Sequence, residues 1–187
     1  TINNEDYNYA KFNMFKKTLC YKINGVGLNL SKVHFKKKII NKKGVKKILV
    51  IAAYKKEKGY LELLKVAEIL KNRKIKIECF GYGDNYKFNS IKIKKKLNNI
   101  FFNNFDINLE NKIKKYDILL HLSKREGLPV SLMQCLSVGL PIICYNIRGN
   151  NDLIKNKFNG FFVQSYKDVS NIIYYLNLED KFFNKMR

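Results

Sequence analysis

Residues able to bind a phosphorylated ligand stand in three short segments of this chain. The segments are Lys58-Gly59, Gly81-Tyr82-Gly83 and Glu126-Gly127-Leu128-Pro129-Val130. Glycines allow sharp turns, a lysine supplies a full positive charge, and a turn that enters a helix exposes unpaired N–H groups at the positive end of the helix dipole. The chemistry that these segments predict is the binding of a phosphate or diphosphate.

Metal and disulfide chemistry are not predicted. The histidines are His34 and His121, and the cysteines at positions 20, 79, 135 and 144 contain no Cys-x-x-Cys spacing. A structural zinc site needs clustered Cys and His ligands, which this spacing does not supply. Three of the cysteines lie in apolar stretches, where a thiol packs as a small hydrophobic group. We therefore expect free cysteines and a reducing, cytoplasmic setting.

The elements that must position the three segments alternate between short apolar runs and segments with helical periodicity. Strands are expected at 47–53, 75–80, 100–102, 117–122, 141–145 and 160–163, and helices at 60–71, 90–97, 109–115, 131–138, 150–155 and 168–176. This alternation predicts an α/β fold with a doubly wound, Rossmann-like parallel sheet. Ligands of such sheets bind outside the carboxyl ends of the strands, which is where the three segments fall.

The domain organisation follows from the length and from where the alternation starts. A chain of 187 residues has the length of one domain. Residues 1–40 do not follow the alternation and are interpreted as a lead-in segment, strand or linker, whereas residues 41–187 form the predicted domain. The first residue is Thr1, and a helix expected over 180–187 ends abruptly, so we expect a piece of a longer protein, truncated at its C-terminus.

The charge of the chain favours anionic partners without choosing among them. Lys and Arg number 37 against 15 Asp and Glu, a formal net charge of +22, which suits nucleic acid, acidic lipid or phosphorylated ligands. AT-rich codons would also explain abundant Lys, Asn, Ile, Phe and Tyr. A hydrophobic content of 46% excludes a disordered chain. No segment has the apolar length of a membrane span or the pattern of a signal peptide.

The C-terminal half carries a specific combination of motifs. They are Ser123-Lys-Arg-Glu-Gly-Leu-Pro-Val-Ser-Leu-Met-Gln-Cys-Leu-Ser-Val-Gly-Leu-Pro-Ile-Ile143, Asn146-Ile-Arg-Gly-Asn-Asn-Asp-Leu-Ile154 and Asn159-Gly160. This combination resembles the nucleotide-sugar-binding half of family 4 retaining glycosyltransferases, also called the glycosyl transferases group 1 domain. Asn24-Gly-Val-Gly27 is similar to the segment that enters this half. The Arg-Glu-Gly-Leu-Pro and Ile-Arg-Gly-Asn sequences resemble transferases of bacterial capsular or exopolysaccharide.

The resemblance implies a two-lobed GT-B enzyme of the hexosyltransferase type that works with retention and without a metal or other cofactor. Its donor is a nucleotide diphosphate-sugar of the UDP type, held by this lobe. A missing N-terminal lobe would hold a glycan or lipid-linked acceptor, so this chain alone is expected to be weakly active. The implied location is the cytoplasm, with peripheral attachment to the anionic inner face of the plasma membrane, and nucleic acid is not an implied partner.

The resemblance also assigns site residues. Glu126 corresponds to the first glutamate of the family's E-x₇-E motif, which contacts the donor sugar, and Lys58 corresponds to a lysine beside the diphosphate. These two are the expected catalytic residues, since positive charge and N–H dipoles stabilise the leaving diphosphate. The residues expected to border the donor are Gly83, Gly127, Leu128, Pro129, Val130 and Gln134.

Two positions depart from the family pattern. The second glutamate of the motif, which bonds the ribose in the family, is Gln134 here, and the usual arginine after the first strand is Ala53. Hydrogen bonds to charged groups contribute ~1.5–3 kcal/mol and neutral ones ~0.5–1.5 kcal/mol, so we expect nucleotide affinity to fall by roughly an order of magnitude. Lys55 or Lys56 could replace the missing positive charge.

Other interpretations stay open at the level of the sequence. Glu126 would also suit a helix start, and Lys58 would also suit a solvated surface. Arg148 could meet donor, acceptor or solvent, whereas His121 and Met133 are expected to pack in the core. For the whole chain, the alternatives are a sugar-nucleotide epimerase, or a basic module on a Rossmann-like scaffold that binds nucleic acid or an anionic membrane. Steep salt dependence would distinguish the basic module from a buried donor site.

Overall fold

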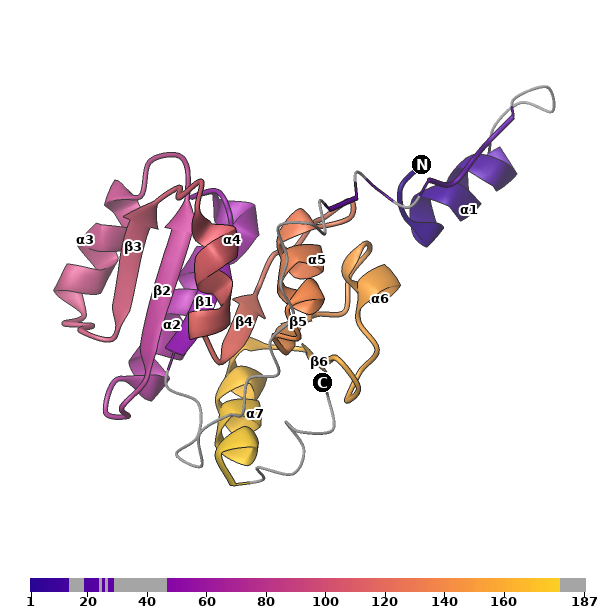
Figure 1. The fold of residues 1–187 in the computed structure, drawn as a ribbon. Helices are drawn as coiled ribbons and strands as arrows, with labels where there is room; N and C mark the ends of the chain where they lie inside the picture. The colour runs from indigo at the N-terminus through magenta and orange to yellow at the C-terminus, as the bar shows by residue number, and fades with distance from the viewer. Residues whose placement is uncertain (14–18, 24, 26, 29–46, 179–187) are drawn as a thin grey trace.

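The computed structural model describes residues 1–13, 19–23, 25, 27–28 and 47–178, and its centre is one parallel sheet (Figure 1). The six strands are β1 (Lys47–Ile51), β2 (Lys76–Gly81), β3 (Ile100–Asn104), β4 (Ile118–His121), β5 (Ile142–Tyr145) and β6 (Gly160–Val163). Their order across the sheet is β3-β2-β1-β4-β5-β6. This is the doubly wound arrangement, and the chain direction across the sheet reverses between β1 and β4. The predicted fold class is confirmed.

Helices cover both faces of the sheet. They are α2 (Tyr60–Leu70), α3 (Tyr86–Lys94), α4 (Leu109–Lys112), α5 (Val130–Ser137), α6 (Asn150–Leu153) and α7 (Tyr166–Leu178), with 3-10 turns η2 (Lys56–Lys58) and η3 (Ile113–Lys115). Ile48 and Val50 of β1 pack in one core with α2, α3 and α7, whereas Leu49 packs in the other with α4 and α5. Alternate residues of a strand face opposite sides, so β1 contributes to both cores.

The predicted elements agree with the observed ones to within a few residues. The largest difference is α3, which begins at Tyr86 rather than near residue 90. Its start is set by a turn, because the Asp84 side chain accepts a hydrogen bond from the Tyr86 amide at 2.8 Å. The four cysteines are free, and Cys79, Cys135 and Cys144 are buried. In the described part of the chain, no helix is long and apolar enough to cross a membrane.

The N-terminal segment is not a strand where the structure describes it, whereas its interpretation as a lead-in segment or linker stays a prediction. Residues 4–13, interpreted as part of a linker or lead-in strand, form helix α1 (Asn4–Asn13), which projects away from the sheet in Figure 1. Asn3 Oδ1 accepts from the Asp6 amide at 2.8 Å, and Asn3 Nδ2 donates to Asp6 Oδ2 at 2.9 Å. A reciprocal cap of this kind starts a helix without the apolar stripe that the periodicity argument requires. The lead-in residues 29–40 and the helix expected over 180–187 lie outside the described residues.

Candidate functional site

Loops that follow β1, β2, β4 and β5 enclose a pocket of about 390 Å³, which we call the donor pocket. It lies at the carboxyl ends of the strands, beside the reversal of strand order, where doubly wound sheets hold their ligands. Its lining side chains carry four cations and two carboxylates. The lining residues are Ala53, Lys55, Glu57, Lys58, Tyr82, Arg125, Glu126, Gly127 and Arg148.

An ion pair between two loops is at the centre of this pocket. Lys58 Nζ lies 2.7 Å from Glu126 Oε1, and His121 Nε2, at the end of β4, lies 3.2 Å from the same oxygen. The side chains of Glu126 and His121 are 12% and 3% exposed. The two residues that the sequence nominated as catalytic, 68 positions apart in the chain, are therefore in direct contact.

The Glu126 carboxyl is ionised at neutral pH. Burial alone would raise its pKa, but the hydrogen-bonding and charged neighbours His121, Lys58 and Ser123 outweigh burial and lower the pKa to about 2. An ionised carboxylate accepts hydrogen bonds and donates none. Glu126 is therefore suited to hold hydroxyl groups or cations.

Gly59 sets the position of Lys58. It has a φ of +79°, and a Cβ at this residue would lie 2.1 Å from the Leu122 carbonyl oxygen. A residue with a side chain would be strained by the φ and would also collide with the backbone after β4. The close approach of these two backbones allows the η2 turn to place Lys58 against Glu126.

A second close approach holds the Glu126 loop from its other side. Gly149 has a φ of +80°, and a Cβ there would lie 2.1 Å from the Gly127 carbonyl oxygen. Arg148 Nε donates to the Glu126 carbonyl at 3.1 Å, and its NH1 group donates to Asp6 Oδ1 at 2.6 Å. Arg148, which the sequence left open, thus lines the pocket and ties the N-terminal segment to the loop that enters α5.

The N-terminus of α5 follows Glu126 after the two residues Gly127 and Leu128. Its N-cap residue is Pro129, and no side chain caps it. The Leu132 and Met133 amides bond to the Pro129 carbonyl. An uncapped helix start presents amide hydrogens and a partial positive charge. The sequence predicted a phosphate cradle at this helix start. Its first residues, Pro129 and Val130, are not among the residues that line the donor pocket, and their contact with a phosphate stays a prediction.

The other nominated residues are more scattered. Gly83 has a φ of +99° and follows Tyr82 in the chain, but it is not among the residues that line the donor pocket. Leu128 turns to a separate hollow of about 230 Å³ together with Met133. Gln134 lies on the next turn of α5, where its Nε2 donates to Glu110 Oε1 at 2.7 Å. Gln134 is not among the lining residues, and its contact with a ribose stays a prediction.

Several lining residues were not nominated from the sequence. Tyr82 is 66% exposed at the rim. Arg125 adds a positive charge to the lining, and Glu57 adds a negative charge. The signal for Tyr82 was its place between two glycines at a strand end. Ala53, at the position of the family's arginine, lines the wall together with Lys55, which we nominated as a replacement. His121 is buried, as expected, but its contact with Glu126 was not foreseen.

Comparisons with known proteins bear on this geometry. The family model for glycosyl transferases group 1 matches residues 32–183. A curated Escherichia coli protein, UDP-Gal:alpha-D-GlcNAc-diphosphoundecaprenol alpha-1,3-galactosyltransferase, is 38% identical over 65 residues, which are 35% of this chain and 16% of that protein. The chain therefore matches a small part of this curated relative.

Two solved structures share the fold. A TarM variant from S. aureus, in complex with fondaparinux, alpha-GlcNAc-glycerol and UDP, superposes with a TM-score of 0.83 at 20% identity, over 99% of this chain and 38% of TarM. The C-terminal domain of the group 1 protein LpcC from Francisella tularensis superposes with a TM-score of 0.70 at 17% identity, over 86% of this chain and 92% of that domain. The fold is that of one Rossmann-like lobe of a GT-B glycosyltransferase.

Proposed function

The chain belongs to the glycosyl transferases group 1 family, and we propose that it is the lobe that binds a UDP-sugar in a retaining glycosyltransferase of the hexosyltransferase type. The observation that carries this proposal is the contact between Lys58 and Glu126 in a pocket at the carboxyl ends of the strands. Different residues of the pocket are assigned below to the diphosphate, the sugar and the nucleoside of the donor.

The diphosphate is the part of the donor that the charges favour. Lys55, Lys58, Arg125 and Arg148 line the pocket. The uncapped start of α5, which follows the lining residue Gly127 in the chain, is the proposed source of amide donors. A lysine ammonium has three N–H donors, so Lys58 can keep its bond to Glu126 and also reach a phosphate oxygen. In the reaction that we propose, these groups stabilise the charge that develops on the departing diphosphate as the acceptor hydroxyl attacks. The proposal includes no metal.

The sugar is assigned to Glu126. Lys58 and His121 both approach its Oε1 atom, and the carboxylate is ionised. We infer that the remaining acceptor capacity of the carboxylate holds sugar hydroxyls next to the scissile bond. Gly127, which lines the pocket, completes the wall on this side.

The nucleoside is assigned to the rim beyond β2. The Tyr82 ring is exposed there, so a base can stack on the ring. The Nε2 atom of Gln134 donates to Glu110, and the Oε1 atom of the same amide is the proposed acceptor for a ribose hydroxyl. As a neutral acceptor it is weaker than the glutamate of the family pattern.

The acceptor and the biological setting come from the relatives. The E. coli relative is named as a galactosyltransferase acting on a diphosphoundecaprenol-linked sugar, and the TarM complex contains UDP and a GlcNAc-glycerol. We infer a glycan or lipid-linked acceptor in cell-envelope or polysaccharide synthesis, on the cytoplasmic side of the membrane. The chain spans 38% of TarM, so the acceptor lobe is expected in the remainder of such a protein. The family match favours the transferase over the epimerase alternative.

Calorimetric titration of the chain with UDP and with UDP-sugars tests the proposal. We expect millimolar or tighter binding, a loss of about tenfold for Lys58→Gln through one charge-assisted contact, and no effect of Lys87→Gln, an exposed lysine on α3. For Glu126→Gln, affinity for UDP-sugar should fall more than affinity for UDP. Absence of binding at millimolar UDP, or equal effects of Lys58→Gln and Lys87→Gln, would contradict the donor-site assignment.

A further inference from the structure

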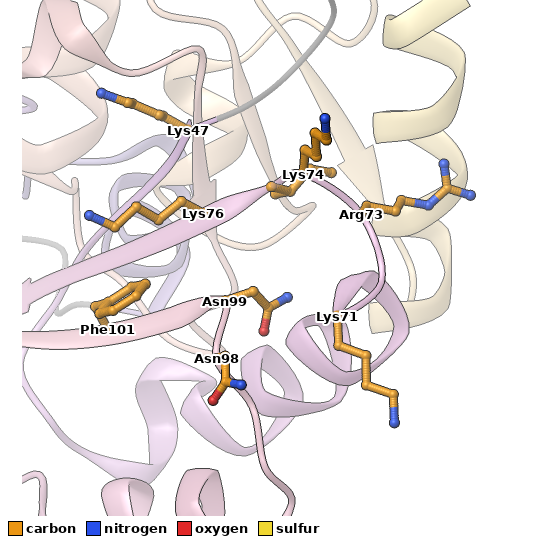
Figure 2. Close-up of a pocket in the computed structure, with 9 residues that line it drawn as sticks. Lys47, Lys71, Arg73, Lys74, Lys76, Asn98, Asn99 and Phe101 are labelled. Atoms are coloured by element: carbon orange, nitrogen blue, oxygen red, sulfur yellow. The ribbon is translucent and has the colours of Figure 1, made fainter.

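A second pocket, which we call the basic pocket, lies at the opposite end of the sheet, beside the amino ends of β1, β2 and β3 (Figure 2). Its volume is about 440 Å³. The donor pocket lies at the carboxyl ends of the same strands. A strand of five residues such as β1 spans roughly 16 Å, so the two pockets cannot hold one small ligand together.

The charge of the basic pocket has one sign. Five of its lining side chains are cationic, namely Lys47, Lys71, Arg73, Lys74 and Lys76. The part of the chain that the structure describes contributes no carboxylate to the lining. Among the ion pairs of these described residues, one involves the pocket, between Lys76 and Glu78. The donor pocket, by contrast, balances part of its charge with Glu57 and Glu126.

Strand register and a short turn gather these cations. Lys47 and Lys76 are the first residues of neighbouring strands and face one another in register. Arg73 and Lys74 lie in the turn between α2 and β2, which is closed by a 2.7 Å hydrogen bond from the Ile75 amide to the Arg73 carbonyl. The backbone therefore starts these side chains from two strands and a turn at one edge of the sheet. The Arg73 guanidinium lies over the Tyr174 ring, 5.5 Å from its centroid.

A polar side chain without a full set of partners lies among these cations. Asn99 is 8% exposed and lines the pocket, and Figure 2 shows its carboxamide amid the labelled basic side chains. Its Nδ2 donates to the Ala67 carbonyl at 2.8 Å, which fixes the orientation of the amide. Its Oδ1 has no hydrogen-bond partner in the described structure. Buried polar groups in proteins are normally hydrogen-bonded, so this acceptor is open to a donor from outside the described residues.

We propose that the basic pocket binds a phosphate ester of a polyol, independently of the donor pocket. The cations bind the phosphate oxygens, and a hydroxyl of the same ligand donates to Asn99 Oδ1. A glycerol phosphate has this chemistry both as a free ester and as the headgroup of an anionic lipid such as phosphatidylglycerol. The combination of one-signed charge with an unpartnered acceptor favours such an ester over an anion that brings no hydroxyl donor.

Residue-resolved NMR of the ¹⁵N-labelled chain, titrated with glycerol 1-phosphate and with inorganic phosphate, tests this inference. We expect signals of the Asn99 side-chain amide and of the 73–76 turn to shift, with the ester binding several-fold more tightly. The variant Arg73→Gln/Lys74→Gln should weaken binding about tenfold, because two charged contacts are lost. The control Lys87→Gln/Lys94→Gln removes the same charge from exposed positions of α3 and should change affinity less than about twofold.

Asn99→Ala tests the hydroxyl contact separately. It should abolish the preference for the ester over inorganic phosphate and leave phosphate affinity nearly unchanged. The charge variants decide the phosphate site whether or not Asn99→Ala folds. Co-sedimentation with phosphatidylglycerol vesicles, with phosphatidylcholine vesicles as the control, shows whether the ester is a lipid headgroup or a free molecule. Vesicle binding that is lost in Arg73→Gln/Lys74→Gln indicates a lipid headgroup. Binding of the soluble ester without vesicle binding indicates a free ester.

Three results would overturn the inference. The first is that glycerol 1-phosphate shifts only NMR signals of donor-pocket residues such as Tyr82 and Gly127. The second is that no signal shifts at millimolar ester, and the third is that the two double variants lose the same amount of affinity for the ester. A UDP titration of the same sample reports on the donor pocket through those donor-pocket signals. Failure of the donor-site proposal is therefore distinguishable from failure of this one.

Discussion

The two ends of the sheet carry pockets of similar size with opposite designs. At the carboxyl end, Lys58 is paired with Glu126 and Arg148 with Asp6, so charges are held in place before any ligand arrives. At the amino end, five cations surround a pocket whose lining has no described carboxylate. The first arrangement is preorganised for one geometry, and the second attracts anions through an unbalanced field.

The backbone differs in the same way between the two ends. Gly59 and Gly149 bring loops of the donor pocket within distances that no side chain permits. The basic pocket is built from ordinary strand starts and a short turn. A precise contact between distant residues thus depends on special backbone positions, whereas a cluster of charge requires only that strands begin side by side.

The largest expected effect tests the backbone half of this comparison. In Gly59→Ala, the new Cβ would stand at a residue with positive φ and 2.1 Å from a backbone oxygen. We therefore expect the free energy of unfolding to fall by at least about 3 kcal/mol and UDP binding to be lost. Gly27→Ala is the matched control, since Gly27 has a φ of +71° but no atom within 4 Å of an added Cβ. It should cost only about 1–2 kcal/mol. Urea denaturation measures both, and equal losses would show that the close approach is unimportant.

The second effect concerns the paired charges. The folded-state pKa of Glu126 is about 2, below its ordinary value of 4.5, so the ionised carboxylate stabilises the fold fully above about pH 4.5. This contribution is lost as the pH falls from 4.5 through 2. The free-energy difference between the native chain and Glu126→Gln should therefore shrink between pH 5 and pH 3 in denaturation experiments. A difference that is independent of pH would place the carboxylate outside the ion pair.

Much of the fold was predictable because its signals are local. The α2 helix shows its buried residues at helical spacing, and each strand is a short apolar run, so periodicity located both. Helix α1 escaped because a polar cap starts it and it buries only Ala10 among its residues. The contacts of its cap residue Asn3 with Gly127 and of Asn4 with Asp152 span more than 120 positions, and no periodicity encodes them.

The candidate site was predictable to a lesser degree. The motif resemblance nominated Glu126 and Lys58, and the structure brings them together. Tyr82, Arg125 and the contact of His121 depend on how separate loops fold over one another. The basic pocket was hidden for a different reason, because lysines are so frequent throughout the chain that no run of them marked a site. Strand register brings Lys47 and Lys76 together, and the turn after α2 adds the other cations.

A smaller effect compares the two pockets through salt. Raising ionic strength from 50 to 500 mM should weaken binding of glycerol 1-phosphate at the exposed basic pocket by roughly tenfold, because exposed charges are screened over about a Debye length. UDP binding in the donor pocket should fall less, since its partly buried contacts are screened less. Calorimetry at several salt concentrations measures both. The same salt dependence at both ends would remove the contrast between preorganised and diffuse charge.

The smallest effect separates affinity from stability within α5. Gln134→Glu gives the ribose a charged acceptor but sets it against Glu110, which Gln134 now contacts at 2.7 Å. We expect stability to fall by about 0.5–1 kcal/mol from like-charge repulsion while UDP affinity rises several-fold. Adding Glu110→Gln restores the hydrogen bond in the opposite direction, from a glutamine at position 110 to a glutamate at position 134. The double variant should therefore regain stability and keep the higher affinity for UDP. If the single variant gains no affinity, residue 134 does not reach the ribose, and the nucleotide is held by the diphosphate cradle and the Tyr82 rim alone.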